Sequence, residues 1–404
     1  DAEEKAAALY GADRCYYSVN GSTAGLLTAI SAAVPEGGKL ILARNCHKAV
    51  YHAIELGQLT ARWLTPPVDP QFGIYGSVRP ADVAAALDAA PDARCVILTS
   101  PTYEGVLSDI RTIAEICHAR GVPLLVDEAH GAHYLPFAAR YGWRGGAVAA
   151  GADLVVQSAH KTLPSLTQTA FLQLNGDLAD PAEVERQLDV FETSSPSYPL
   201  MVSLDGCTRW LADEGEAAFA AWRTRLDAFD AAVRDLKNTK ILCCGADALT
   251  AHSDFFAHDS GKILLQIGAA GAAYLRADGF EPEMVCGPNV LAMTSPCDDA
   301  DALERLADVL HAWDKTAAPP AAPRHILPAP GAARCTIAEA VRMRDAVGET
   351  AAEYLWAYPP GVPLVAPGEE VTAELVTACR ALEQAGTALK HTGGSGAEEI
   401  AVLL

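Results

Sequence analysis

The chain has 404 residues, half of them hydrophobic, and a formal net charge of −21. This length and composition allow a sizeable core in one large domain or in two to three moderate ones. The acidic balance argues against binding to a nucleic-acid backbone, which requires a basic surface. No apolar run approaches the roughly 18 residues of a membrane-spanning helix. We therefore predict neither a nucleic-acid nor a membrane partner.

The first half of the chain alternates short apolar runs with helical patterns, beginning with the amphipathic pattern DAEEKAAALYGAD. Strands are predicted at CYYSVNG (15–21), KLILAR (39–44), ARCVILTSP (93–101), VPLLVDEAH (122–130) and ADLVVQSAHK (152–161). Helices are predicted between several of them, at STAGLLTAISAAV (22–34), HKAVYHAIELG (47–57) and DIRTIAEICHARG (109–121). Apolar strands separated by helices indicate a mostly parallel sheet covered on both faces, that is, an α/β fold.

After about residue 200 the pattern changes. Residues 204–237 form one long helical stretch, and KILLQIG (262–268) and NVLAMTS (289–295) look like strands of a smaller α+β domain. A Pro/Ala-rich linker follows at 316–330, and then AYPPGVPLVAPGEEV (357–371), a rigid loop, and a C-terminal helix. We predict three domains: 1–235, 236–315 and 331–404.

A polar cluster follows each predicted strand of the first half: NGST, RNCH, SPTY, DEAHGAH and SAHK. Ligands of doubly wound sheets bind at the carboxyl ends of the strands. Five such clusters can therefore meet at one edge of one sheet.

Lys161, in the run QSAHKTLPSLTQ, follows a buried strand, where an ammonium group is expensive to bury. A lysine whose pKa is lowered by its site can form a Schiff base with an aldehyde. Pyridoxal phosphate also requires an acid for its pyridine nitrogen, an anion site for its phosphate and a planar group to stack on its ring. Asp127 follows its own strand 34 residues earlier and fits the first of these, although a lone Asp is commonly a helix cap.

The run NGSTAG (20–25) joins a strand to a helix and fits the anion site. Gly21 allows a close approach of the backbone, while Ser22 and Thr23 offer hydroxyl and N–H groups at a helix N-terminus. An ordinary helix cap would explain this run equally well. His47 could stack on a flat ring, or it could be a structural histidine.

Two other interpretations are rejected. DEAH (127–130) matches a helicase motif, but neither Gly38-Lys39 nor Gly261-Lys262 has the spacing of a phosphate-binding P-loop. His130 and His133 have no third ligand at metal-site spacing, so we expect no metal. The eleven cysteines are odd in number and lack a CxxC pair, which favours reduced thiols and a cytoplasmic protein.

The combination resembles the ornithine/lysine/arginine decarboxylase family of fold-type-I pyridoxal phosphate enzymes. The resemblance runs through nearly the whole chain and rests on these runs: VNGSTAG, ARNCHKAV, SPTYEGV, VDEAHGAH, GADLVVQSAHKTLPSLTQTA, TSSPSYPLMVSLD and AYPPGVPLVAPGEE. QSAHKTLPSLTQ and YPPGVPLVAPGE are the most specific of them. The resemblance implies decarboxylation of arginine, lysine or ornithine to CO₂ and a polyamine precursor.

The resemblance also implies roles for residues. Lys161 holds the cofactor and later helps to move protons, Asp127 pairs with the pyridine nitrogen, and His47 stacks on one ring face. The remaining implied positions are Gly21, Ser22, Thr23, Ser158 and His160 around the phosphate and cofactor, His130 near the ring and substrate, and Thr102 near the cofactor.

The family further implies several tens of residues before the segment that matches Asp1, and a homodimer with active sites at the interface, to which TSSPSY (193–198) could contribute. Two alternatives remain open. One is another fold-type-I enzyme, an aminotransferase or an aldolase, which would share Lys161 and Asp127. The other is a catalytically inactive member that binds partners.

Overall fold

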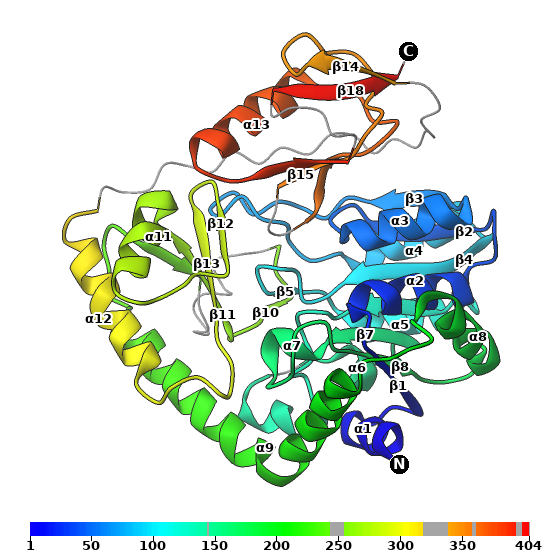
Figure 1. Cartoon of the computed structure of the whole chain (residues 1–404), viewed down its shortest axis with the longest axis horizontal. Coiled ribbons are helices and arrows are strands. Elements are labelled where there is room, and N and C mark those ends of the chain that lie inside the picture. The colour runs from blue at the N-terminus through cyan, green and yellow to red at the C-terminus, as the bar shows by residue number, and fades with distance from the viewer. Residues whose placement is uncertain (144, 243–253, 318–337, 358–360, 393–397, 404) are drawn as a thin grey trace.

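The computed structural model describes residues 1–143, 145–242, 254–317, 338–357, 361–392 and 398–403. Its first half is built on a seven-stranded sheet with the order β1-β8-β7-β6-β4-β2-β3 (Figure 1). The strands are β1 (Arg14–Ser18), β2 (Lys39–Ala43), β3 (Thr60–Leu64), β4 (Ala93–Thr99), β6 (Leu124–Asp127), β7 (Leu154–Ser158) and β8 (Ala170–Leu174). β8 runs antiparallel to both of its neighbours, and every other pair is parallel. The predicted mostly parallel sheet is confirmed, with β3 and β8 in addition.

Two layers of helices cover the sheet because its strands are apolar on both faces. Leu40 and Leu42 pack toward α2 (Gly21–Ala33), α3 (Lys48–Gly57) and α8 (Pro181–Phe191), whereas Ile41 packs toward α4 (Pro80–Ala89), α5 (Ile110–His118) and α6 (Ala147–Ala150). The alternation of these three side chains follows the two-residue period of a strand. The short helix α7 (Ala159–Thr162) follows β7 directly.

The 35-residue helix α9 (Tyr198–Ala232) leads from the large sheet to a smaller one (Figure 1). Its C-terminal half and the helices α11 (Gly268–Ala277) and α12 (Ala302–Asp314) share one core with α1 (Ala2–Tyr10) and the 3₁₀ helix η1 (Pro136–Tyr141). The small sheet is antiparallel, in the order β12-β13-β11-β9. Its strands are β9 (Lys240–Leu242), β11 (Lys262–Gln266), β12 (Met284–Cys286) and β13 (Asn289–Met293). The two strands predicted in this region, at 262–268 and 289–295, are thus present.

The two halves are joined by a short pairing of β5 (Val106–Leu107) with β10 (Ala257–His258). The C-terminal part contains two small antiparallel sheets and the helix α13 (Ala373–Gln384). Its strands are β14 (Ala338–Arg342), β15 (Leu355–Ala357), β16 (Pro363–Val365), β17 (Leu389–His391) and β18 (Glu399–Leu403). Most of the predicted linker 316–330 lies outside the described residues. Among the described helices, none has both the length and the apolar character needed to cross a membrane.

Candidate active site

Because β8 runs antiparallel to both β1 and β7, β1 points the same way as β2, β4, β6 and β7. The carboxyl ends of these five strands therefore share one edge of the sheet, and a cavity of about 330 Å³ lies there. Each of the five predicted polar clusters contributes to its wall. The predicted site residues that line it are Ser22, His47, Asp127, His130, His160 and Lys161.

Lys161 lies in the first turn after β7, and its Nζ is 2.8 Å from His130 Nε2. Burial lowers the pKa of Lys161, while the nearby carboxylates of Asp127 and Glu283 oppose that shift. A lowered pKa increases the fraction of lysine present as the nucleophilic amine.

Asp127 is the last residue of β6 and is only 3% exposed. Its Oδ1 accepts a hydrogen bond of 3.1 Å from the N–H of Ala129. Burial raises the pKa of Asp127, and the proximity of Lys161 counteracts this. A buried carboxyl group at this position is suited to bind a protonated ring nitrogen, because such a group favours a cationic partner.

His47 caps the N-terminus of α3, where its Nδ1 accepts a hydrogen bond of 3.2 Å from the N–H of Ala49. Burial, followed by the charges of Lys161 and Lys48, lowers the pKa of His47 to about 3. The imidazole is therefore neutral at physiological pH, with its proton on Nε2. A neutral ring can pack on an aromatic ligand without burying a charge.

Candidate donors for an anion lie at the start of α2 and at the end of β7. Gly21 has a φ of +78°. The side chain of Asn20, which precedes α2, makes no capping hydrogen bond and thus leaves the N–H groups of the first turn available to a ligand. The hydroxyl of Ser158 is buried and without a hydrogen-bond partner within the described part of the chain. His160 Nδ1 donates to the carbonyl of Thr169 at 3.0 Å. A phosphate group would satisfy the unused donors.

Four predicted positions are not in the cavity wall: Gly21, Thr23, Thr102 and Ser158. Thr23 is exposed at the surface of α2. Thr102 Oγ1 accepts a hydrogen bond of 3.1 Å from the N–H of Val106 and thus stabilises the loop between β4 and β5, while its neighbour Tyr103 reaches the cavity.

Among the cavity residues that were not predicted are Tyr103, Glu283 and Val362. The hydroxyl of Tyr103 donates to Glu283 Oε1 at 2.6 Å, and its ring lies 4.5 Å from that of His130 between centroids. Tyr103 and Val362 lie within two of the motifs that carry the family resemblance, SPTYEGV and YPPGVPLVAPGE. Glu283 lies in the run EPEM, which carries no comparable signal.

The C-terminal part reaches the cavity beside His47. The N–H of Lys48 donates to the carbonyl of Gly361 at 3.3 Å, which holds Val362 against the start of α3. Arg44 and Glu369 form an ion pair of 2.8 Å in which both side chains are almost fully buried. Across the described ranges, no group of three or more His, Cys, Asp or Glu side chains is arranged to hold a metal ion.

Comparison with known protein families identifies the family of this chain. Residues 1–264 match the major domain of the Orn/Lys/Arg decarboxylases. The chain belongs to the Orn/Lys/Arg decarboxylase family. Residues 328–397 match the C-terminal domain of the same family. The family is thus the one that the motifs indicated, and it identifies the chain as a decarboxylase.

Individual relatives agree with this assignment. The chain is 31% identical over 411 residues to an arginine decarboxylase of Halalkalibacterium halodurans, covering 96% of this chain and 81% of the relative. It is 31% identical over 399 residues to an arginine decarboxylase of Bacillus subtilis, covering 93% and 79% respectively. The solved structure of the constitutive lysine decarboxylase of E. coli matches all of this chain and 72% of its own, with a TM-score of 0.78 and 20% identity. The predicted fold-type-I architecture is confirmed.

Proposed function

We propose that this decarboxylase binds pyridoxal phosphate at Lys161 and releases CO₂ from a basic amino acid, with arginine as the preferred substrate. The observation that carries the proposal is the cavity at the carboxyl edge of the large sheet. There a lysine with a lowered pKa, a buried carboxyl group and a neutral histidine meet, and Ser158, three residues before that lysine, has an unused hydroxyl donor. These are the four groups that pyridoxal phosphate requires of its site.

The cofactor, when bound, supplies an electron sink for the electron pair left behind by the departing CO₂. The chain's own residues bind and orient the reactants. Lys161 would hold the cofactor covalently and Asp127 would keep a proton on its ring nitrogen. His47 would cover one face of the ring and exclude water there. Ser158 and the N-terminus of α2 would hold the phosphate, and His130 would hold or pass a proton beside Lys161.

Two observations support arginine. The relatives that match over more than nine-tenths of this chain at 31% identity include two named arginine decarboxylases, whereas the E. coli constitutive lysine decarboxylase matches over 51% of it in sequence. The cavity also contains the carboxylate of Glu283, oriented by Tyr103, as an acceptor for a cationic side chain. The product would be agmatine, a precursor of polyamines.

The test is an absorbance spectrum of the protein with added pyridoxal phosphate, followed by CO₂ release from arginine, lysine and ornithine. We expect a long-wavelength band and the fastest release from arginine. Lys161→Ala should abolish both, and Lys39→Ala, which changes a surface lysine paired with Asp92, should leave both unchanged. A band without CO₂ from any of the three would refute the proposed reaction, and the absence of a band would refute the cofactor.

We also propose that the chain forms a homodimer next to this site. Leu166, Tyr198 and Val202 are 54%, 75% and 70% exposed, which is unusual for large apolar side chains so close together. The N–H of Leu166 donates to Ser203 Oγ at 2.8 Å, so the loop after Lys161 and the start of α9 form one surface. A second copy of the chain on this surface would cover the apolar side chains at the margin of the cavity.

A further inference from the structure

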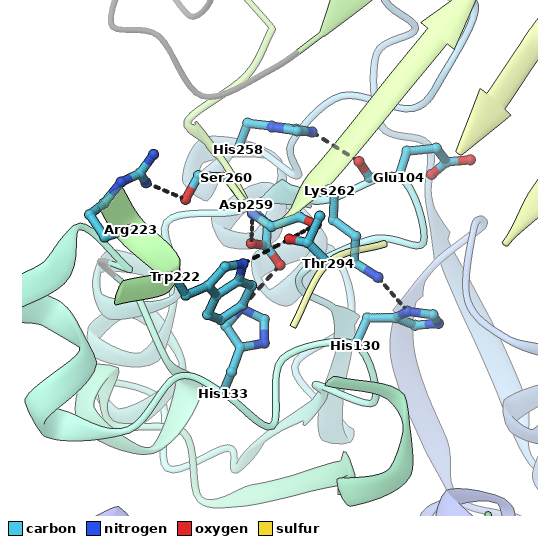
Figure 2. Close-up of polar contacts among 11 residues, drawn as sticks. Glu104, His130, His133, Trp222, Arg223, His258, Asp259, Ser260, Lys262 and Thr294 are labelled. Atoms are coloured by element: carbon cyan, nitrogen blue, oxygen red, sulfur yellow. Dashed lines mark hydrogen bonds and ion pairs between the residues drawn. The ribbon is translucent and has the colours of Figure 1, made fainter. Parts of the chain in front are cut away.

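His130 lies between two lysines. Its Nε2 is 2.8 Å from Lys161 Nζ, and its Nδ1 is 2.9 Å from Lys262 Nζ. Figure 2 shows Lys262 extending from the small sheet toward His130. Lys262 begins β11, is 1% exposed, and does not line the cavity. The three nitrogen-bearing side chains thus form a chain that leads from the cavity into the protein interior.

The hydrogen-bonding capacity of these groups limits their charge. A neutral imidazole has one N–H donor and one lone pair, whereas an ammonium group can only donate. If both lysines were charged, one of them would face the N–H of His130 rather than its lone pair. Burial, followed by the charges of the two lysines, also holds the pKa of His130 well below its ordinary value, so the imidazole stays neutral. With both hydrogen bonds formed, at most one of the two lysines is charged.

The surroundings of Lys262 are suited to hold that proton. Burial lowers the pKa of Lys262 to about 8, and the neighbouring carboxylates oppose the shift. Asp259 is buried, and despite that burial His133 and Lys262 hold its pKa below the ordinary value, so it supplies a negative charge. The charged groups that act on Lys161 are Asp127 and Glu283. Those that act on Lys262 are Asp259, Glu283, Glu104 and Lys161. The titratable side chains of His47, His130 and His160 are also close enough to Lys161 to interact with it.

The absence of a side chain at Gly105 leaves room for the side chain of Lys262. Gly105 has a φ of +102°, and a Cβ there would lie 2.8 Å from Lys262 Cγ. The adjacent Glu104 carbonyl bonds to His258 Nε2 at 2.9 Å, which fixes this loop against the small domain (Figure 2). The aliphatic part of Lys262 is therefore held in one position, with its amine directed at His130.

We propose that Lys262 is a positioning residue that takes up, through His130, the proton which Lys161 must lose to react as an amine. Lys161 gives its proton to His130 Nε2 while His130 Nδ1 gives its own proton to Lys262 Nζ. One N–H bond breaks and one forms at each end, and the total charge of the three groups is unchanged. The reverse transfer recharges Lys161 without a proton from solvent. The inference rests on the proposed role of Lys161 as the amine that holds the cofactor.

The experiment measures the protonation of Lys161 in the whole chain freed of cofactor. Trace acetic anhydride is applied between pH 6 and 10, and acetylation of Lys161 is measured by mass spectrometry relative to the exposed Lys315. In Lys262→Met, Lys161 is the only remaining holder of the proton. We expect its half-titration to move up by about one pH unit and its acetylation at pH 7 to fall about tenfold.

Lys262→Arg distinguishes a proton-holding role from a packing role. A guanidinium group stays charged and donates to His130 Nδ1, so Lys161 should remain as reactive at pH 7 as in the wild type. Lys240→Met removes a charge from the neighbouring strand β9, where Lys240 is exposed, and should change nothing. Circular dichroism and the unfolding midpoint confirm that each variant is folded.

Two results would overturn the inference. One is a Lys161 titration in Lys262→Met that coincides with that of the wild type. The other is equal loss of reactivity in the Met and Arg variants. If Lys262→Met does not fold, ¹⁵N spectra of histidine-labelled wild type decide, with His130→Gln for assignment: a single tautomer of His130 at every pH would equally exclude the transfer. Since no cofactor is present, these results are independent of the absorbance test of the proposed function.

Discussion

His47 has a helix-capping contact and a cavity-facing ring at the same time. The capping contact and the contact with a ligand can be tested separately, because capping needs a hydrogen-bond acceptor and stacking needs a ring. His47→Asn retains an oxygen that can cap α3 but removes the ring, whereas His47→Phe retains a ring but removes the cap.

We expect His47→Asn to keep most of its stability and to bind pyridoxal phosphate about fivefold more weakly, since stacking on a ring contributes about 1 kcal/mol. His47→Phe should lose about 1 kcal/mol of unfolding free energy and retain most of the affinity. Cofactor titration and urea unfolding measure the two quantities. Equal affinity in both variants would contradict stacking. Because the pKa of His47 is about 3, neither variant should shift the pH dependence of activity above pH 5.

The burial of Lys262 should also make the unfolding free energy depend on pH. Its pKa is about 8 in the folded chain and 10.5 as an ordinary lysine. Between these values the unfolded chain binds more protons than the folded one, so the unfolding free energy rises with pH. The gain amounts to about 3 kcal/mol over the whole window. Below pH 8 both states are protonated and the folded state bears the full cost of the buried charge.

Urea unfolding at pH 7, 8, 9 and 10 measures this slope. In Lys262→Met the unfolding free energy should no longer show this rise with pH, whereas in Lys240→Met the rise should remain. Parallel curves for the wild type and Lys262→Met would show that burial of this amine has no energetic cost.

The sequence indicated Lys161, Asp127 and His47 because each lies at the carboxyl end of a predicted strand or just after it, which is the position that places a residue at this edge of the sheet. It did not indicate Lys262. In the sequence Lys262 was noted only beside Gly261 and as the start of a predicted strand, and its partner His130 lies 132 residues earlier, in the turn after β6. Glu283 is a similar case, since its contact with Tyr103 spans 180 residues. Contacts between residues this far apart in the chain leave no local pattern in either segment.

At the scale of single elements, the role of the N-terminus of α2 in binding phosphate can be tested with two glycine variants. Gly21 and Gly37 have φ values of +78° and +73°, and at neither would an added Cβ meet a heavy atom closer than 4.0 Å. Replacing either by Ala therefore costs backbone strain alone, about 1–2 kcal/mol. Only Gly21→Ala also displaces the first turn of α2.

We expect both variants to lose similar unfolding free energy and only Gly21→Ala to bind pyridoxal phosphate more weakly, by about tenfold. Inorganic phosphate should compete with the cofactor in the Gly37→Ala protein as in the wild type. An unchanged affinity in Gly21→Ala would show that the phosphate binds elsewhere.

The strands that the sequence did not predict were missed for physical reasons. β3 is at the edge of the sheet, and its residues alternate in exposure, with Thr60 exposed and Arg62 in the middle of the strand. β8 contains Gln173, which is fully buried because its amide donates to Gln157 on β7 at 3.2 Å. A buried glutamine that is hydrogen-bonded to a neighbouring strand interrupts the apolar pattern from which strands are predicted. The helices carried stronger signals, and α2, α3, α5 and α9 all lie where expected.

At the scale of the whole molecule, the ion pair of Arg44 and Glu369 joins the large sheet to the C-terminal part. Glu369 Oε2 also accepts from the N–H of Ala366 at 2.9 Å, and Arg44 donates to the carbonyl of Pro363 at 3.1 Å. Glu369→Gln leaves a buried guanidinium without its counter-charge, which costs about 3–5 kcal/mol. Asp82→Asn, in the exposed pair with Arg79, should cost less than about 1 kcal/mol.

Urea unfolding compares the two pairs. Because the Arg44 pair holds the segment that carries Val362, Glu369→Gln should also weaken cofactor binding, and Asp82→Asn should not. A stability loss in Glu369→Gln no larger than in Asp82→Asn would mean that water reaches Arg44. The predicted division into domains 1–235, 236–315 and 331–404 stays a prediction, and this ion pair is a contact between the first and the last of them.

The proposed dimer is also a property of the whole molecule, and its test is its mass. A chain of 42.4 kDa should scatter light as a particle of about twice that mass at micromolar concentration. Tyr198 and Val202 are four residues apart on one face of α9, so Val202→Asp places a charge in the middle of the proposed contact. That variant should be monomeric, while Val347→Asp, at another exposed valine, should remain dimeric. If the surface completes the active site, the Val202→Asp monomer should still bind pyridoxal phosphate but release CO₂ far more slowly. A fully active monomer would show that each active site is formed by a single chain.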